Sequence, residues 1–198
     1  ARLGAENGPN VMVSDGKCDG GEGVAGSSRE NGGSAEAGAC HIGEMEQIEA
    51  VWQHIRDKHG KLDILVNNAA TNPYFGKIEE TDLAAFQKTV DVNIRGYFFM
   101  CAEAAKLMKE QGQPGAIVNV ASVNGVTPGF MQGIYSITKS AVIAMTRAYA
   151  RELGPDNIRV NALLPGLTDT KFASALTTND SIRDRTKEST PMPRRAAP

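Results

Sequence analysis

The sequence predicts an α/β fold, a doubly wound parallel sheet with helices on both of its faces. Three observations predict it. Short apolar runs alternate along the chain with segments whose apolar residues recur every three or four positions. The apolar runs are nearly continuous, as they are in strands that are buried on both faces. Strands that alternate with helices are typical of βαβ units, whose crossovers are right-handed.

The first third of the chain predicts three strands and a helix. Residues 10–15 form the first strand, and a glycine-rich stretch over 16–38 follows it. Residues 39–42 are a second short apolar run, and residues 62–66 are a third that asparagines bound. Between the last two we expect a helix over 44–58, because five apolar side chains recur there at helical spacing: Met45, Ile48, Val51, Trp52 and Ile55.

The rest of the chain predicts two long helices and two strands. A single helix is expected over 81–111, where one face collects seven apolar side chains: Leu83, Phe86, Val90, Ile94, Tyr97, Cys101 and Met108. Residues 115–122 are rich in β-branched side chains and predict a strand. A second helix over 134–153 and a last strand over 158–164 each end at a Gly/Pro pair.

Composition favours one globular domain over 1–198 and excludes several functional classes. The 198 residues carry 21 basic and 23 acidic side chains, a net charge of −2, so we expect neither nucleic acid nor an anionic membrane as partner. No apolar run approaches the roughly 20 residues of a membrane-spanning helix. The cysteines Cys18, Cys40 and Cys101 form no Cys-x-x-Cys pair, which excludes a disulfide scaffold and a zinc ribbon. We therefore expect a cytoplasmic protein without a metal site.

Polar residues that directly follow the strands are the candidates for a site. In doubly wound sheets, ligands bind beyond the carboxyl ends of the strands. The residues at those positions are Asp15, His41, Asn67, Asn68, Ser122 and residues 168–170. His41 either lies against a ligand or satisfies its own loop, and we assign it no catalytic role.

Tyr135 and Lys139 are the strongest catalytic candidates. Their i, i+4 spacing places both side chains on one helix face, and a nearby cation favours the phenolate and lowers the pKa of a tyrosine. Such a tyrosine can donate and accept a proton near neutral pH. Ser122 stands 13 residues before Tyr135, where its hydroxyl could hydrogen bond a substrate carbonyl. Asn93 interrupts the long helix pattern, which suggests a local kink and a water held near Lys139.

Each of these features also has a simpler interpretation. Tyr-x-x-x-Lys occurs by chance in many helices, and a serine at the end of a strand often caps a turn. A polar residue such as Asn93 can be tolerated on a half-buried face. The order of the motifs, rather than any one of them, carries the functional interpretation.

The ordered set resembles the short-chain dehydrogenase/reductase family, over nearly the whole chain. Asn67-Asn-Ala-Ala70 after a strand, Asn93, Ser122, Tyr135-x-x-x-Lys139 and Asn161-x-x-x-Pro165-Gly166 occur in the family's order. The run over 67–76 and the Cys40-His41 pair are most similar to its branch of carbonyl and retinal reductases. The resemblance implies a Rossmann-like fold and the transfer of a hydride between NAD or NADP and a ketone, aldehyde or secondary alcohol.

The resemblance also implies a role for each catalytic candidate. Tyr135 would be the general acid in reduction and the general base in oxidation. Lys139 would lower the pKa of Tyr135 and bind the hydroxyls of the nicotinamide ribose. Ser122 would hold and polarise the carbonyl, and Asn93 would complete a proton relay through water.

Other residues would contact the cofactor, again by resemblance. Asn67, Ala69 and Ala70 would lie beside the adenosine ribose, although relatives usually have glycine where this chain has Ala70. A second group would close over the nicotinamide: Pro165, Gly166, Thr168 and Thr170. A carboxylate at Asp15 accepts hydrogen bonds from ribose hydroxyls and repels a 2′-phosphate, so NAD is favoured over NADP, although Lys17 could partly compensate for that repulsion.

The family's first strand and its phosphate-binding glycine loop are absent from this sequence. The sequence Gly21-x-Gly23-x-x-Gly26 does not open a helix directly after a strand, so we reject it as that loop and expect a frayed or mobile segment. Both ends of the chain look truncated. Residues 171–190 would form a substrate loop, and a lid is expected there.

Three functional hypotheses remain open. The first is the oxidoreductase that the catalytic candidates imply. The second is a non-catalytic, truncated form that acts only by associating with other subunits. The third is a 3-oxoacyl-thioester reductase. That activity would prefer NADPH, whose 2′-phosphate Asp15 would repel, so Asp15 is evidence against this hypothesis. The resemblance also implies a homodimer or homotetramer that pairs through helices 81–111 and 134–153, with a small carbonyl compound or alcohol as substrate.

Overall fold

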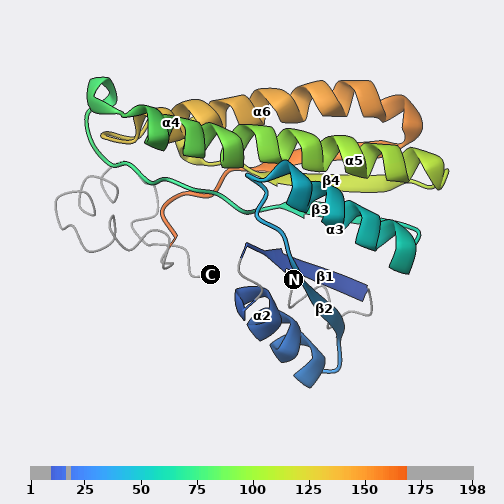
Figure 1. Cartoon of the computed structure of the whole chain (residues 1–198). Coiled ribbons are helices and arrows are strands. Elements are labelled where there is room, and N and C mark those ends of the chain that lie inside the picture. The colour runs from blue at the N-terminus through green and yellow to red at the C-terminus, as the bar shows by residue number, and fades with distance from the viewer. Residues whose placement is uncertain (1–9, 17–18, 169–198) are drawn as a thin grey trace.

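The computed structural model describes residues 10–16 and 19–168, and its strands form two separate parallel sheets (Figure 1). The smaller sheet pairs β1 (Asn10–Asp15) with β2 (Ser34–Ala39), in a register that places Asp15 opposite Ala39. Helix α2 (Asp19–Glu30) connects the two strands and packs on them. This β-α-β unit carries Asp15 at the carboxyl end of β1.

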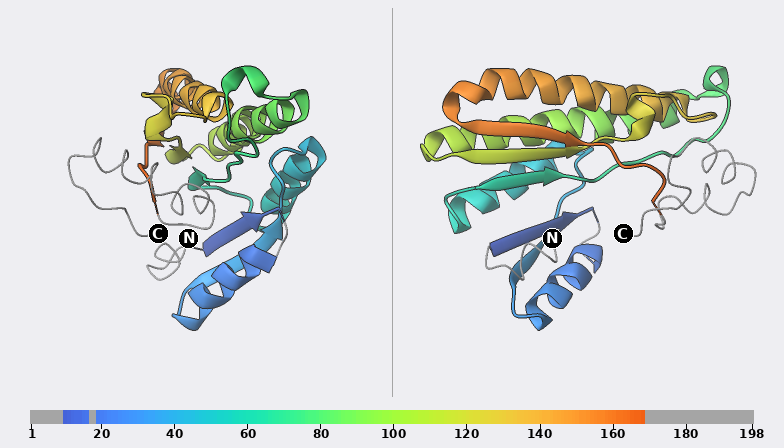
Figure 2. Two further views of the ribbon diagram at one scale, coloured as in Figure 1. Left: turned by 90° about the vertical axis from the view of Figure 1, so that its left-hand side faces the viewer. Right: turned by 180° about the vertical axis from the view of Figure 1, so that it is seen from behind.

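The larger sheet has three parallel strands in the order β3-β4-β5. They are β3 (Ile64–Asn67), β4 (Gly115–Val120) and β5 (Ile158–Leu163). Within the described residues no strand joins this sheet to the smaller one, so β3 pairs on one side alone. The parallel strands and the Rossmann-like organisation that the sequence predicts are confirmed, and among the described residues the helices cover one face of this larger sheet (Figure 2).

Helices cover the larger sheet on one face, as both views in Figure 2 show. Helix α4 (Leu83–Val90) runs through a π-helical turn (Asp91–Gly96) into α5 (Tyr97–Glu110), and α6 (Gly133–Leu153) lies beside them. Helix α3 (Met45–Lys58) packs between α5 and β2. Short 3₁₀ turns connect these elements: η1 (Ile78–Glu80), η3 (Val123–Gly125) and η4 (Gly154–Asp156). None of the described helices is long and apolar enough to cross a bilayer.

The other face of the larger sheet is open over the described residues. Leu65 points into the core, whereas its neighbours Ile64 and Val66 are 60% and 57% exposed. Leu163 on β5 is exposed in the same way. Strand residues alternate between the two faces, so these side chains share the face that α5 and α6 do not cover.

The π-helical turn corrects the expected single helix over 81–111. An i→i+5 turn inserts one extra residue, which rotates the helix before it relative to the helix after it. Tyr97 and Cys101, after the turn, are fully buried as expected. Leu83 and Phe86, before it, are exposed instead, and Thr89 is the buried residue of α4.

The core forms between α3, α5, α6 and the larger sheet. The predicted apolar stripe of α3 is confirmed. Trp52 on α3 and Cys101 on α5 are both core residues. Fully buried Ile117 on β4 and Val142 on α6 pack in the same cluster. Burying each such side chain stabilises the fold by about 1.5–3 kcal/mol.

Two expectations for the N-terminal region are wrong. The second strand occupies Ser34–Ala39 rather than 39–42, because residues of that earlier segment pair with β1. The glycine-rich segment is a regular helix, α2, rather than a frayed one. Its glycines permit close packing, because a Cβ at Gly21 would lie 3.2 Å from the Val13 carbonyl oxygen. The rejected Gly-x-Gly-x-x-Gly motif therefore lies inside a helix.

Candidate active site

The four catalytic candidates converge beyond the carboxyl end of β4. Ser122 follows that strand and caps η3, while Tyr135 and Lys139 lie on the first turns of α6. Asn93 reaches the same region from the π-helical turn, which packs on α6. All four residues are at least nine-tenths buried. The structure thus brings together side chains that are 46 positions apart at the extremes, since 139 − 93 = 46.

Asn93 is held by three hydrogen bonds and is completely buried. Its side-chain amide donates to the Thr71 carbonyl at 2.9 Å and to the Thr138 hydroxyl at 3.0 Å, and its oxygen accepts from the Thr71 amide at 2.9 Å. The break in the helix expected at Asn93 is present as the π-helical turn. Asn93 contacts Thr138, the neighbour of Lys139, rather than Lys139 itself.

Ser122 and Tyr135 are joined by a side-chain hydrogen bond. The Ser122 oxygen also accepts from the Asn124 amide at 3.1 Å, which fixes the rotamer of the serine. Burial raises the pKa of the Tyr135 phenol above its ordinary value, and the hydrogen bond with Ser122 acts against that rise. Tyr135 is therefore a neutral phenol at neutral pH, already in contact with a second hydroxyl.

Lys139 is an almost fully buried amine with one backbone acceptor. Its ammonium donates to the Val120 carbonyl at 2.8 Å and lies 5.2 Å and 5.6 Å from the ring centres of Tyr97 and Tyr135. Burial lowers the pKa of Lys139 from 10.5 to about 8. Because a lysine has three N–H donors, two remain for other acceptors.

The expected lowering of the Tyr135 pKa by Lys139 is not found in this structure. Burial dominates at the phenol, and its pKa is raised. The Lys139 ammonium donates to the Val120 carbonyl and lies over the Tyr135 ring, 5.6 Å from its centre. A phenol that releases its proton near neutral pH would need that ammonium, or other donors, closer to its oxygen.

Asn67, a predicted cofactor contact, is buried and takes part in a hydrogen-bond network with core residues. Its side-chain nitrogen donates to the Asn119 oxygen at 2.9 Å and lies 3.3 Å from the Cys101 sulfur. Asn119 in turn donates to the Thr146 hydroxyl at 3.0 Å. Burial raises the pKa of the Cys101 thiol to about 12, although its hydrogen bonds with Asn119 and Asn67 act against the rise. This network ties β3, β4, α5 and α6 together directly beneath the site.

The remaining cofactor candidates lie at the carboxyl ends of the strands. Ala69 is exposed and Ala70 is half-buried in the loop after β3. The Pro165 carbonyl accepts from the Val123 amide at 3.1 Å, which holds the segment after β5 against the site. Next to Gly166, the Thr168 hydroxyl donates to the Gly166 carbonyl at 3.3 Å.

Several expectations fall outside the described residues. Thr170, Lys17 and the substrate loop over 171–190 lie there, as does Cys18. His41 lies within the described residues, and its polar groups form hydrogen bonds within its own loop and with the start of α3. Its ring accepts from the Gly43 amide at 3.2 Å, and its amide donates to Gln47 at 2.8 Å.

Sequence reasoning missed Thr138 and Asn72. Thr138 is buried between Asn93 and the helix, and its hydroxyl donates to the Tyr135 carbonyl at 2.8 Å. The Asn72 oxygen is buried without a hydrogen-bond partner among the described residues, although its nitrogen lies 3.3 Å from Gln132. An unpaired buried acceptor is costly, so Asn72 is a candidate to receive a substrate hydroxyl. An asparagine in the loop after a strand is the only sequence signal.

The site offers polar groups for both riboses of a nicotinamide dinucleotide. The exposed Asp15 carboxylate offers the acceptors that a ribose diol needs, and Lys139 has free N–H donors beside Tyr135. Among residues 10–16 and 19–168, the glycine motif lies within α2, so these residues provide no loop for the pyrophosphate. The donor set thus fits a nicotinamide nucleotide in part.

Comparisons with known proteins agree with this fold and site. A family model described as enoyl-(acyl carrier protein) reductase matches residues 1–198. Dehydrogenase/reductase SDR family member 4 of Oryctolagus cuniculus is 35% identical over 176 residues, which are 89% of this chain and 67% of the relative. The chain therefore belongs to the short-chain dehydrogenase/reductase family, a family of oxidoreductases. The family resemblance expected from its motifs is confirmed.

Solved structures show the same fold with nicotinamide cofactors. A 3-ketoacyl-(acyl-carrier-protein) reductase from Brucella melitensis, complexed with NADH, is 35% identical with a TM-score of 0.87, and the match covers 100% of this chain and 78% of that one. A gluconate 5-dehydrogenase from Burkholderia cenocepacia, in complex with NADP and tartrate, is 25% identical with a TM-score of 0.90, covering 98% and 75%. Relatives of this fold thus use either cofactor.

Proposed function

We propose that the protein is an NAD(P)-dependent oxidoreductase that interconverts a ketone or aldehyde and an alcohol. One observation carries the proposal. The Ser122 hydroxyl is hydrogen bonded to the Tyr135 phenol, with the Lys139 ammonium buried 5.6 Å from the tyrosine ring. Two hydroxyls and a cation that converge in a buried site can polarise a carbonyl and exchange a proton with its oxygen.

In the proposed mechanism each residue has one task. In the reductive direction, Tyr135 donates its phenolic proton to the substrate oxygen, and in oxidation it accepts that proton. Ser122 hydrogen bonds to the same oxygen and orients it. The nicotinamide supplies or accepts the hydride when it is bound. Because burial raises the pKa of Tyr135, the phenol keeps its proton until a carbonyl oxygen that is gaining negative charge can accept it.

Lys139 and Asn93 support that proton transfer. The free N–H donors of Lys139 would bind ribose hydroxyls and stabilise the phenolate left on Tyr135. One hydrogen bond of Asn93 joins the π-helical turn to Thr138 on α6, in the turn after Tyr135, and two join it to Thr71 in the loop after β3. We propose that a water bound there completes a proton relay.

NAD is the proposed cofactor, and its adenosine ribose would lie at Asp15. The Asp15 carboxylate is exposed at the carboxyl end of β1, where it would repel the 2′-phosphate of NADP. Titration of the 198-residue chain with NADH and NADPH, followed by fluorescence, tests this preference. Tighter NADH binding supports it, and equal affinities contradict it.

The matched pair Tyr135→Phe and Tyr149→Phe tests the mechanism. Both residues lie on α6, but the Tyr149 hydroxyl donates to the Phe98 carbonyl away from the site. With NADH and a panel of ketones and aldehydes, Tyr135→Phe should lower turnover by about 10²–10⁴-fold, as expected for a lost general acid. Cofactor affinity should not change, and Tyr149→Phe should keep its turnover. Unchanged turnover in Tyr135→Phe would refute the role of the phenol.

A 3-oxoacyl-thioester reductase is the second candidate. The solved 3-ketoacyl-(acyl-carrier-protein) reductase that this chain resembles was complexed with NADH, so Asp15 and that activity are compatible. Including a 3-oxoacyl thioester in the substrate panel separates the two candidates. If the wild-type chain binds neither cofactor and turns over no substrate, the non-catalytic hypothesis is the one that survives.

We also propose that the chain forms a homodimer or homotetramer through α4, α5 and α6. Their outer surface exposes large apolar side chains, with Leu83 at 78%, Phe86 at 45% and Phe99 at 37%. Exposed clusters of this kind often mark interfaces. Light scattering should give a mass of two or four chains, and Phe86→Arg should reduce it. A wild-type protein of monomer mass would contradict the proposal.

A further inference from the structure

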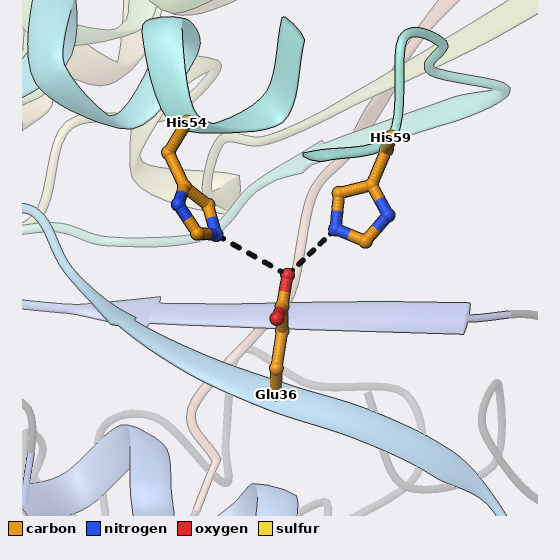
Figure 3. A group of neighbouring side chains, drawn as sticks. All are labelled: Glu36, His54 and His59. Atoms are coloured by element: carbon orange, nitrogen blue, oxygen red, sulfur yellow. Dashed lines mark hydrogen bonds and ion pairs between the residues drawn. The ribbon is translucent and has the colours of Figure 1, made fainter. Parts of the chain in front are cut away.

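Glu36, His54 and His59 form a cluster that includes none of the candidate active-site residues (Figure 3). Glu36 lies on β2, His54 on the outer face of α3, and His59 is the residue at which α3 ends. Both imidazoles direct a ring nitrogen at the same carboxylate oxygen. The His59 Nε2 atom lies 2.6 Å from Glu36 Oε1, and the His54 Nε2 atom lies 3.6 Å from it.

From this geometry we infer a binding site for a divalent transition-metal ion, zinc foremost, between Glu36, His54 and His59. Two imidazole nitrogens and one carboxylate oxygen are a ligand set that suits zinc rather than magnesium or calcium. Three ligands from the protein leave a further coordination position for water, which the exposure of both histidines allows. This departs from the sequence prediction of no metal, which had considered only cysteine spacing.

The distances are close to those that coordination requires. Bonds of about 2.0–2.1 Å in a tetrahedral site place ligand atoms about 3.3 Å apart. The separation of His54 and Glu36 is already near that value, and the three ligand atoms all lie within 4.8 Å of one another. Displacements under about 1 Å, small for exposed side chains, would bring all three to bonding distance.

Lys58 shapes the site through the second carboxylate oxygen. Its ammonium is hydrogen bonded to Glu36 Oε2, which leaves Oε1 directed at the two histidines. Such an outer hydrogen bond orients a ligand and favours binding through one oxygen. The positive charge of Lys58 also repels a cation, so this lysine acts on the site in two opposing ways.

Metal at this position would join two parts of the fold. The β1-α2-β2 unit and the larger sheet share no strand within the described residues, and β2 meets the rest of the protein through α3. An ion bound between Glu36 and the two histidines would cross-link β2 to the end of α3. Zinc binding should therefore raise the melting temperature of the 198-residue chain.

Metal titration of the chelator-treated full chain tests the site. We expect the wild type to bind one Zn²⁺ per chain by calorimetry, and Co²⁺ to give the visible absorption of a four-coordinate ion. His54→Gln, His59→Gln and Glu36→Gln should each weaken binding by at least about tenfold. His41→Gln, the matched control at the third histidine, should bind as the wild type does.

Lys58→Met provides a test that a merely nonspecific histidine site would fail. Removing the ammonium should change the zinc affinity, because it removes both the hydrogen bond that orients Glu36 and one positive charge near the ion. No uptake of Zn²⁺ by the wild type would overturn the inference, and the cluster would then be an ion pair. Binding that survives His54→Gln and His59→Gln, or that ignores Lys58→Met, would place the metal elsewhere and overturn it too.

Discussion

Replacing Lys139 by methionine should make the protein more stable at neutral pH. Burial lowers the pKa of Lys139 from 10.5 to about 8, and the free-energy cost of holding that charge in the core is about 3 kcal/mol at pH 7. Methionine fills a similar volume without the charge. The loss of the Lys139 hydrogen bond to the Val120 carbonyl reduces this gain by about 1 kcal/mol. The loss is no larger because the carbonyl still accepts a hydrogen bond from the Tyr97 hydroxyl at 3.2 Å. A net gain of about 2 kcal/mol remains.

The gain should depend on pH in a defined way. The unfolded chain keeps the Lys139 proton until about pH 10.5, whereas the folded chain releases it above about pH 8. Between these values the unfolded state binds more protons, so the wild type gains about 1.4 kcal/mol per pH unit. The stability of the variant does not change with pH in this way, so the difference in free energy of unfolding between variant and wild type should disappear near pH 9.5. Tyrosines titrate in both proteins and cancel in the difference.

Urea denaturation measures this difference directly. Trp52, the single tryptophan, is 2% exposed in the core, so its fluorescence reports unfolding of both proteins. We would compare wild type and Lys139→Met at several values from about pH 7 to pH 10, where the wild-type slope is expected. A variant that is less stable at neutral pH, or a difference that does not change over this range, would refute the reasoning.

Four further substitutions test the packing by urea denaturation. Asn93→Ala removes three hydrogen bonds, two to Thr71 and one to Thr138, and should cost about 3 kcal/mol, whereas a loss below 1 kcal/mol would mean that water replaces the amide. Ile117→Ala should cost about 2–5 kcal/mol, while Ile64→Ala, at an exposed position, should cost under about 0.5 kcal/mol, and equal losses would contradict the core assignment. Met131→Gly should stabilise the protein by about 1 kcal/mol, because Met131 has φ 58°, and a loss would show that its side chain packs.

Periodicity predicted most elements of the fold because their apolar residues repeat. The stripe of α3 and the apolar runs of β3 to β5 are signals that a single sequence contains. Strand β2 has no such signal: its residues 34–39 are mainly small, and it is a strand because Met12 and its neighbours pair with it. The rotation at the π-helical turn is also invisible to periodicity, since the pattern of 81–111 continues through it.

The order of motifs identified the catalytic candidates, but not how they interact. Ser122 and Tyr135 meet as expected. One partner of Asn93 is Thr138, 45 positions away, and Asn67 bonds to Asn119 over 52 positions. Such contacts depend on how α6 and the sheet pack, which spacing along one chain does not encode. The pKa of Tyr135 likewise depends on burial, which outweighs the nearby cation.

The unpaired side of β3 has a consequence for how the protein exchanges hydrogen with solvent. Strand β4 is paired with β3 on one side and with β5 on the other, so its amide protons are shielded in both directions. Within the described residues, β3 has a neighbour on one side alone. The N–H groups that point away from β4 have no strand partner among the described residues, and deuterium should replace their protons without any unfolding of the core. The same edge carries the exposed side chains Ile64 and Val66, and a strand of another chain could pair with it.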